Sequence, residues 1–350
     1  MSGGTEHLLH MLRSQGRFCA GSGSPMYGEL FELVAGDVEA GGAFASILSG
    51  HEDAPSRHAV PLRLLGGLHR LVLDGRAPEL RRWYPSAGGD WDAANAWPEI
   101  LHTAAQHADT LRAALHQPPQ TNEVGRSAAL IGGLLRLNRG FDFPIRLFEI
   151  GSSAGLNMRA DHYRYRYNGG RWGPADSPVT IDDAWRGALP PDGAVRIVER
   201  NGYDIAPIDV TGADGEITAL SYVWPDQDSR LHRLRGAIAV ARNVPARLER
   251  RTAAEAVAGL TLAGGALTVL WHSITWQYLS DAERASVRDG IEALGGQADT
   301  RSPFAHLTLE PAREGRGTPI RFLVRARCWP GGELAILAEC HPHGPPVNWQ

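Results

Sequence analysis

The residues best suited to chemistry lie in one acidic, glycine-rich segment. Glu149 stands near the end of an apolar run over residues 145–150, and the turn Gly151-Ser152-Ser153-Ala154-Gly155 follows directly. Glycine lets a backbone approach a ligand closely in a tight turn, and a helix beginning at Leu156 would lie beneath that ligand. A carboxylate at this point favours a ligand with an ammonium group and repels a pyrophosphate. We therefore expect Glu149, Gly151, Ser152, Ser153 and Gly155 to bind a cationic cofactor rather than a dinucleotide.

A second acidic residue, Asp204, ends a strand predicted over residues 196–203. An acid at a strand end can accept the hydroxyls of a ribose, although it commonly comes ~20 residues after the glycine turn. The longer spacing here would be explained by an inserted segment rich in tyrosine and tryptophan between Glu149 and Asp204. The alternative is that Asp204 only caps the turn before Pro207.

A histidine follows another apolar run, over residues 266–271. Trp271-His272-Ser273 ends this predicted strand, which would place the triplet at the carboxyl edge of a parallel sheet, where ligands bind. His272 is a candidate general base because the ordinary pKa of histidine lies near neutrality, and Ser273 is a candidate beside it. A hydrogen-bonded structural histidine is the alternative.

The same turn permits two other kinds of protein. Gly151 to Gly155 also matches Gly-x-Ser-x-Gly, the nucleophile elbow of serine hydrolases, with Ser153 as nucleophile. The order Ser153, then Asp204 or Asp226, then His272 or His306 is the hydrolase order. Against this, the preceding residues look helical, whereas a hydrolase elbow follows several strands, and no His-Gly-Gly segment precedes the turn. A third possibility is a binding protein that keeps the fold and lacks chemistry.

Two regions of different periodicity must position these residues. Up to about residue 140, apolar residues recur at helical spacing, as in Leu62, Leu65, Leu68 and Val72, with breakers between the pieces. We predict a helical cap domain over residues 1–140, partly covering the carboxyl edge of the sheet that follows.

After Pro144 the pattern changes to strands alternating with helices. Strands are predicted over residues 145–150, 196–203, 245–249, 266–271 and 304–309, with helices over 226–242 and 281–294. This alternation indicates an α/β domain over residues 141–350 with a parallel, doubly wound sheet. Residues 319–327 and 333–340, joined by Pro330-Gly331-Gly332, read as a closing antiparallel hairpin.

These features resemble class I S-adenosylmethionine (SAM)-dependent methyltransferases. The segment from Phe148 to Gly155 is similar to their first motif, acidic-x-Gly-x-x-x-Gly, and the segment ending in Asp204 is similar to their second strand. The closing hairpin fits the same fold. The resemblance implies a Rossmann-like sheet that binds SAM and transfers a methyl group to an unknown small molecule; a non-catalytic SAM- or nucleotide-binding protein remains the alternative.

The whole chain also resembles a bacterial family catalogued as domain of unknown function 2332. The resemblance rests on residues 120–126, 149–157, 163–167, 224–227, 271–273 and 341–344. It adds Asn157 to the cofactor-binding candidates. The segment with Asn122, Glu123 and Arg126 lies shortly before the first predicted strand, so its polar face could reach the site. Together with Tyr163 and Asp226 these residues are the substrate-binding candidates. We expect Arg126 to offer its guanidinium to a carboxylate, with a salt bridge to a nearby acid as the alternative. The chain departs from the family at Thr252-Ala253, where an Asp-Ala pair would meet adenine.

Composition narrows the function further. The chain has no lysine among its 35 basic residues, which excludes Schiff-base chemistry and a Walker A loop. A net charge of −4 gives no reason to expect a nucleic-acid partner. The three scattered cysteines suggest neither a disulfide framework nor a metal site, and no apolar run is long enough for a membrane span. We expect a cytoplasmic protein with a small-molecule substrate; its oligomeric state is not readable from the sequence.

Overall fold

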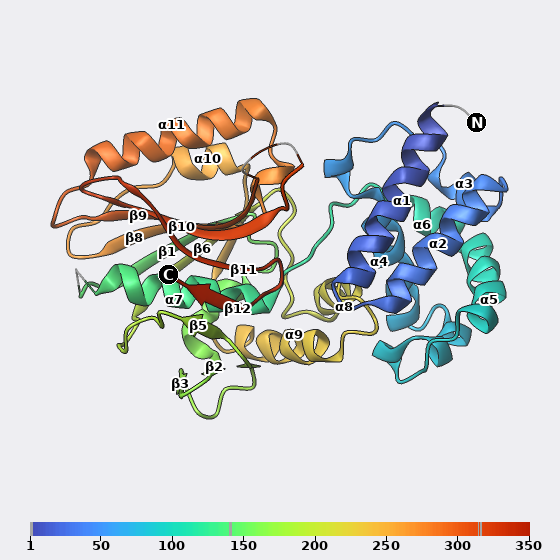
Figure 1. The fold of residues 1–350 in the computed structure, drawn as a ribbon, viewed down its shortest axis with the longest axis horizontal. Helices are drawn as coiled ribbons and strands as arrows, with labels where there is room; N and C mark the ends of the chain where they lie inside the picture. The colour runs from blue at the N-terminus through green and yellow to red at the C-terminus, as the bar shows by residue number, and fades with distance from the viewer. Residues whose placement is uncertain (1–2, 140–141, 314, 316) are drawn as a thin grey trace. The chain divides into compact units, whose positions relative to one another are not determined.

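The computed structural model describes residues 3–139, 142–313, 315 and 317–350, and these form two compact units (Figure 1). The helical unit comprises the chain up to Thr121 together with Gly212–Leu231. The sheet unit comprises Asn122–Thr211 and His232–Gln350. Within the described residues, no helix is both long and apolar enough to cross a membrane.

The helical unit is built as the periodicity predicted. Its core is formed by apolar side chains from several helices, among them Leu12, Phe31 and Leu64, which are fully buried. No strand occurs in the described residues up to Arg139. The helices are α1 (Gly3–Gly21), α2 (Pro25–Glu39), α3 (Ala43–Leu48), α4 (Val60–Leu73), α5 (Ala93–Gln106), α6 (Ala108–Ala114) and α8 (Ala213–Ser221), with 3-10 turns η1 (Ser56–His58), η2 (Pro78–Trp83) and η3 (Pro85–Ala87).

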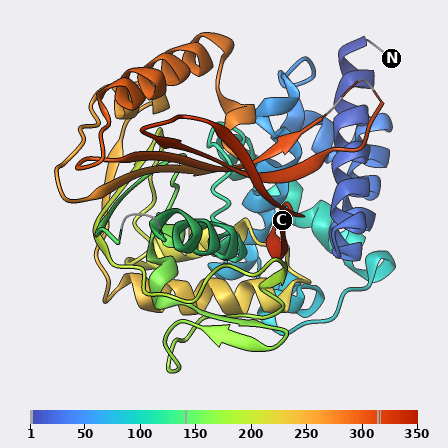
Figure 2. The same ribbon diagram turned by 60° about the vertical axis from the view of Figure 1, so that its left-hand side comes forward.

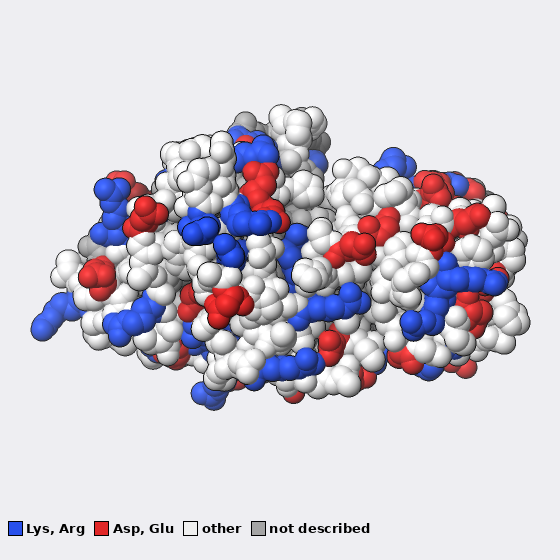
Figure 3. Space-filling view, turned by 90° about the horizontal axis from the view of Figure 1, so that it is seen from below, with Lys and Arg blue, Asp and Glu red and all other residues white. Residues whose placement is uncertain are grey.

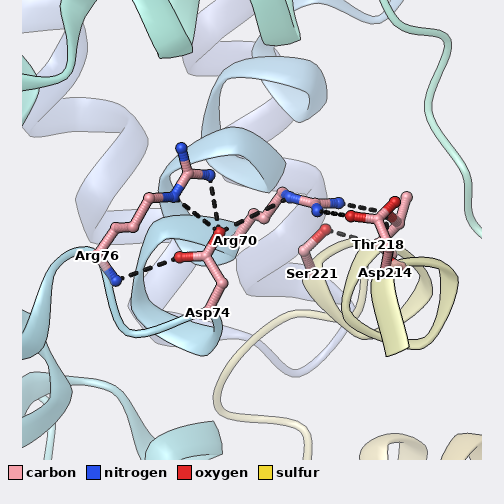
Figure 4. Close-up of polar contacts among 6 residues, drawn as sticks. All are labelled: Arg70, Asp74, Arg76, Asp214, Thr218 and Ser221. Carbon is pink, nitrogen blue, oxygen red and sulfur yellow. Dashed lines mark hydrogen bonds and ion pairs between the residues drawn. The ribbon is translucent and has the colours of Figure 1, made fainter. Parts of the chain in front are cut away.

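Helix α8 joins this unit from a distant part of the chain. Arg70 of α4 donates hydrogen bonds to Asp214 and Thr218 of α8, as Figure 4 shows. A Cβ added at Gly66 of α4 would lie 2.8 Å from the ring of Tyr222, so glycine allows the close approach there. The structure therefore divides the chain differently from a single break near residue 140, because residues 212–231 pack with the helical unit and residues 122–139 with the sheet unit.

The sheet unit contains a nine-stranded sheet in the order β5-β12-β11-β10-β9-β8-β1-β6-β7. The five strands from β9 to β7 are parallel, while β9, β10, β11 and β12 form an antiparallel meander. The strands are β1 (Ile145–Ile150), β5 (Trp185–Gly187), β6 (Ile197–Asp204), β7 (Arg247–Arg250), β8 (Leu267–Ser273), β9 (Phe304–Ala312), β10 (Arg321–Trp329), β11 (Leu334–His341) and β12 (Gly344–Trp349). The predicted mixed α/β architecture with a mostly parallel sheet is confirmed.

Helices cover both faces of this sheet. In Figures 1 and 2, α10 (Ala253–Ala258) and α11 (Asp281–Gln297) lie on one face, and α7 (Ser127–Asn138) lies on the other. Phe148, Leu270 and Phe304 pack against α10 and α11. Because side chains alternate along a strand, Glu149 and Trp271 point to the face of α7.

The predicted helix over 226–242 is confirmed as α9 (Asp228–Ala241). Other elements differ from the prediction or were not predicted. The helix expected from Leu156 is a 3-10 segment, η5 (Leu156–His162). A small sheet of β2 (Arg164–Tyr167), β3 (Gly170–Trp172) and β4 (Thr180–Ile181) follows η5. The strands β5 and β12 extend the main sheet beyond the predicted hairpin.

Charges are mixed over the face seen in Figure 3. Blue and red side chains are both scattered over that face, and its described residues show no continuous basic stripe. The expectations about nucleic-acid partners and the substrate stay predictions.

Candidate functional site

The candidate site lies where the parallel strands reverse their order. Strand β1 is flanked by β6, the next long parallel strand along the chain, and on its other side by β8, which comes later. Ligands of open α/β sheets bind outside the carboxyl ends of the strands at such a switch point. The carboxyl ends of β1, β6 and β8 bring together the glycine turn, Asp204 and Ser273.

The glycine turn has a left-handed backbone at three positions. Gly151 has φ +68°, Ser153 φ +50° and Gly155 φ +65°. The amides of Gly151 and Ser152 both donate to the carbonyl of Tyr203, at 2.8 and 3.1 Å. A Cβ added at Gly151 would lie 2.4 Å from Oγ1 of Thr275, so Thr275, in the loop after β8, packs directly against the turn. Glycine is required at this point on two grounds, its φ and the contact with Thr275.

Asn122 and Glu123 hold this turn and the segment before it. The side-chain oxygen of Asn122 accepts from the amide of Leu156 at 2.8 Å, and its Nδ2 donates to the carbonyl of Ser152 at 3.3 Å. Glu123 accepts from the amide of Gly125 at 2.9 Å, in the 3-10 turn η4 (Val124–Arg126). Both residues therefore act on the backbone around the turn.

Several buried polar atoms of β1, β8 and the segment after β1 have no hydrogen-bond partner in the described structure. Glu149 is 2% exposed and pairs in register with Gly202 of β6 and Trp271 of β8. Among the described residues, its Oε2 accepts no hydrogen bond, and Nε1 of Trp271, Oγ of Ser152 and Oδ1 of Asn157 are also without a partner. Such groups are rare inside proteins and call for an explanation. A polar ligand or ordered water would satisfy them.

Burial raises the pKa of Glu149 to about 8. The nearby indole of Trp271 lowers this pKa in part, Asp204 raises it, and the guanidinium of Arg126 lowers it. Removal from water disfavours the charged form of a carboxyl group, so Glu149 is largely protonated at neutral pH in the ligand-free site. A cation placed beside it would favour ionisation.

Asp204 receives two backbone amides at the end of β6. Its Oδ2 accepts from the amide of Ser153 and its Oδ1 from the amide of Ala206, both at 2.9 Å. Each oxygen keeps a further lone pair for a ligand. The next residue, Ile205, is 59% exposed and offers an apolar surface beside the acid.

Two arginines lie close to the glycine turn. Arg126 donates from Nε to the carbonyl of Pro342 at 3.0 Å and from Nη1 to the carbonyl of Ser273 at 3.4 Å. Arg159, 4% exposed, donates to the carbonyls of Val244 and Gly155, both at 2.8 Å, and burial lowers its pKa. Both of these contacts of Arg126 are with backbone carbonyls, and its binding of a ligand carboxylate stays a prediction.

His272 points to the other face of the sheet from Glu149. Its Nδ1 lies 2.7 Å from Oε1 of Glu310, its Nε2 lies 3.0 Å from Nε2 of His306, and its ring stacks on Trp276. The side chain is 2% exposed. Both ring nitrogens are therefore occupied, which favours the structural alternative over a general base. Ser273 lies at the carboxyl edge, 7% exposed, and its carbonyl accepts from Arg126.

The remaining candidates have local partners. The hydroxyl of Tyr163 donates to the carbonyl of Leu156 at 2.6 Å, beneath the turn. Asp226 belongs to the helical unit, where its carboxylate accepts from Oγ of Ser24 at 2.6 Å and from the amide of Met26 at 3.0 Å. The structure thus brings together the candidates at β1 and β6 but gives Asp226 a role at the start of α2.

Three residues at or near this site were not singled out from the sequence. Thr275 packs against Gly151, and Glu310 accepts a hydrogen bond from the amide of Thr275. Arg159 donates to the carbonyl of Gly155 in the turn. An acid at the end of a buried strand, the pattern of Glu149 and Asp204, would have identified Glu310. Thr252 forms a capping box with Glu255 at the start of α10, which explains a threonine at that position.

Comparison with known proteins gives a family for the chain. The model of one family, described as "Uncharacterized protein conserved in bacteria (DUF2332)", matches residues 9–349. No curated protein and no solved structure matches significantly. Within the described residues, no group of three or more histidine, cysteine, aspartate or glutamate side chains could hold a metal ion. Since the family model spans nearly the whole chain, the protein belongs to this bacterial DUF2332 family.

Proposed function

We propose that the protein binds SAM at the carboxyl edge of β1 and β6 and uses it to methylate a small molecule. The observation that carries the proposal is the buried Glu149 carboxyl group, whose Oε2 has no partner among the described residues. It lies beside a glycine turn at the switch point of the parallel strands.

The unpartnered atoms suit an α-amino acid group. An ammonium group has three hydrogens to donate. Oε2 of Glu149, Oγ of Ser152 and Oδ1 of Asn157 are three acceptors for it. A dinucleotide has no ammonium group and would bring its pyrophosphate towards the acid. The amino-acid end of SAM matches this set.

The neighbouring groups suit the nucleoside end. Asp204 would accept the ribose hydroxyls with its remaining lone pairs, and Ile205 would pack against the adenine. When bound, SAM supplies a methyl group activated by the sulfonium. Thr252, which caps α10 after β7, has no carboxylate to offer to the adenine.

The strand order supports the same fold class. Counted along the chain, the parallel strands β7-β6-β1-β8-β9 have the order 3-2-1-4-5, which is the order of doubly wound nucleotide-binding sheets. The closing meander differs from a simple hairpin because β12 and β5 extend it.

Calorimetry with three ligands tests the proposal. SAM and its demethylated product, S-adenosylhomocysteine, carry the amino-acid group, whereas 5′-methylthioadenosine lacks it. Glu149→Gln should weaken the first two by about 10- to 150-fold, the scale of a hydrogen bond to a charged group. It should leave methylthioadenosine unchanged, and Asp204→Ala should weaken all three.

Glu199→Gln is the matched control. Glu199 also lies on β6 and binds Arg146 outside the site, so its replacement should leave all three affinities unchanged. Failure of the parent protein to bind any of the ligands would refute the proposal. Formation of S-adenosylhomocysteine from SAM in the presence of a bacterial small-molecule extract distinguishes an enzyme from a binding protein that lacks chemistry.

A further inference from the structure

One carboxylate oxygen of Glu310 accepts three hydrogen bonds. Oε1 of Glu310 lies 2.7 Å from Nδ1 of His272, 2.9 Å from the amide of Thr275 and 3.2 Å from the amide of Trp276. Two of the three donors belong to the loop that leaves β8. The Glu310 side chain is 11% exposed, so solvent competes little for these bonds.

The loop held by Glu310 has a strained backbone. Ile274 has φ +53°, a left-handed conformation that is rare for a β-branched residue. Such a conformation persists only where the surrounding contacts enforce it. The two amides that follow Ile274 both bind Glu310, so this carboxylate supplies that constraint.

Thr275, in the loop held by Glu310, packs against the glycine turn. Oγ1 of Thr275 lies 3.5 Å from the carbonyl of Ile150 and 3.3 Å from that of Ser273. The Thr275 side chain also fills the position that a Cβ of Gly151 would take, with its Oγ1, Cγ2 and Cβ 2.4 to 3.0 Å away. The Thr275 side chain therefore limits displacement of the Gly151 backbone toward the loop after β8.

His272 and His306 hold Glu310 in place. The two Nε2 atoms lie 3.0 Å apart and need one hydrogen between them, and burial together with the neighbouring His272 keeps the pKa of His306 well below its usual range. A carboxylate oxygen only accepts, so Nδ1 of His272 is the nitrogen that donates to Glu310. Trp276 stacks on the His272 ring and closes the assembly on the α11 side.

We propose that Glu310 is a positioning residue for the glycine turn, acting through Thr275 of the strained loop on Gly151. The ligand affected would be SAM, and to that extent the inference rests on the proposed function. The contacts that connect Glu310 to the turn through Thr275 exist without a ligand. Their effect on the turn can therefore be tested in the ligand-free protein.

Hydrogen exchange measured by mass spectrometry on the ligand-free full chain tests the link. Glu310→Ala removes the acceptor of two loop amides and should speed exchange about tenfold in peptides covering both 273–277 and 149–155. Thr275→Ala keeps the bonds to the amides of residues 275 and 276 and should speed exchange only in 149–155. Glu310→Gln keeps an acceptor oxygen and should restore both regions to nearly parental rates.

Thr268→Val is the control. Thr268 lies on β8 away from the carboxyl edge, and its buried hydroxyl has no partner in the described structure, so its removal should leave both peptides unchanged. Unchanged exchange in 149–155 in both alanine variants would overturn the inference. So would faster exchange spread equally over β1, β8 and β9 in Glu310→Ala, because that pattern means general loss of stability.

SAM titrations separate the two proposals. If the parent binds SAM, Glu310→Ala and Thr275→Ala should each weaken binding about tenfold and Glu310→Gln should restore it. If the parent does not bind SAM, the proposed function fails and the exchange data still decide whether Glu310 positions the turn.

Discussion

At the scale of the residue, Glu149 is unusual because it is a nearly fully buried acid with an unsatisfied oxygen. Burying a carboxyl group without a partner costs stability, and no group among the described residues forms a hydrogen bond with Oε2. The cost of burying this group motivates the proposal that Glu149 binds a ligand.

The pKa of Glu149 predicts how stability depends on pH. Its folded pKa of about 8 lies above the ordinary value of 4.5, so between these values the folded state binds more protons than the unfolded state. The free energy of unfolding should therefore fall as pH rises from about 5 to 8, by up to about 1.4 kcal/mol per unit. Glu149→Gln should remove this slope, measured by urea unfolding at several pH values.

Glu199→Gln provides the control for that slope. The pKa of Glu199 is lowered, because the Arg146 guanidinium beside it outweighs the raising effect of burial. Its stabilising contribution is complete above about pH 5 and is lost only as the solution becomes more acidic. An equal slope in the parent and in Glu149→Gln would mean that Glu149 is ionised in the ligand-free protein.

Ser153 separates the methyltransferase and hydrolase hypotheses. Its backbone is left-handed, as in a nucleophile elbow, but His272 uses both ring nitrogens on the opposite face of the sheet. We expect no covalent labelling of the parent by a fluorophosphonate and little effect of Ser153→Ala on SAM affinity. Stoichiometric labelling that disappears in Ser153→Ala would instead establish a hydrolase.

At the scale of the element, the sequence predicted the strands and the turn, because local patterns of residue type determine them. The predicted strands over 145–150, 196–203, 266–271 and 304–309 correspond to β1, β6, β8 and β9, and the glycines of the turn do adopt positive φ. The pattern did not reveal that His272 and Glu149 face opposite sides, because that depends on the register of β8 against β1. Nor did it reveal β5 and β12, which are short or proline-containing and pair only through the tertiary fold.

Gly151→Ala tests the turn as an element. The substitution places a Cβ at φ +68° against Thr275, so it should lower the free energy of unfolding by roughly 2 kcal/mol or more. Gly264→Ala is the control, because no atom lies within 4 Å of an added Cβ there. Chemical denaturation of both variants measures the difference, and equal stabilities would mean that the turn moves to accept a side chain.

At the scale of the whole molecule, two parts of the chain cross between units. Residues 212–231, which lie between β6 and β7 in the sequence, belong to the helical unit. Residues 122–139, which include α7, belong to the sheet unit although they precede β1. Sequence periodicity alone could not show this exchange, because α8 and α9 look like an ordinary crossover between parallel strands. Contacts between residues far apart in the chain, such as Arg70 with Asp214, determine it.

Trp224 tests whether the inserted segment is part of the helical core. It is 5% exposed and packs edge-on against Phe18, near Tyr27 and beneath the guanidinium of Arg230. Trp224→Ala should therefore destabilise the helical unit by about 3–5 kcal/mol, the cost of truncating a buried aromatic side chain. Hydrogen exchange should become faster in peptides from α1, α2 and α4 and stay unchanged in β1, β8 and β9.

Trp329→Ala is the reciprocal experiment in the sheet unit. Trp329 is 7% exposed and stacks on Phe304 in the core beneath α10 and α11. Its truncation should speed exchange in β9, β10 and α11 and leave α1 and α2 at parental rates, since each unit has its own apolar core. Opposite patterns in the two variants would show that the units unfold independently. Equal acceleration of both units in either variant would mean instead that the chain unfolds as one cooperative body.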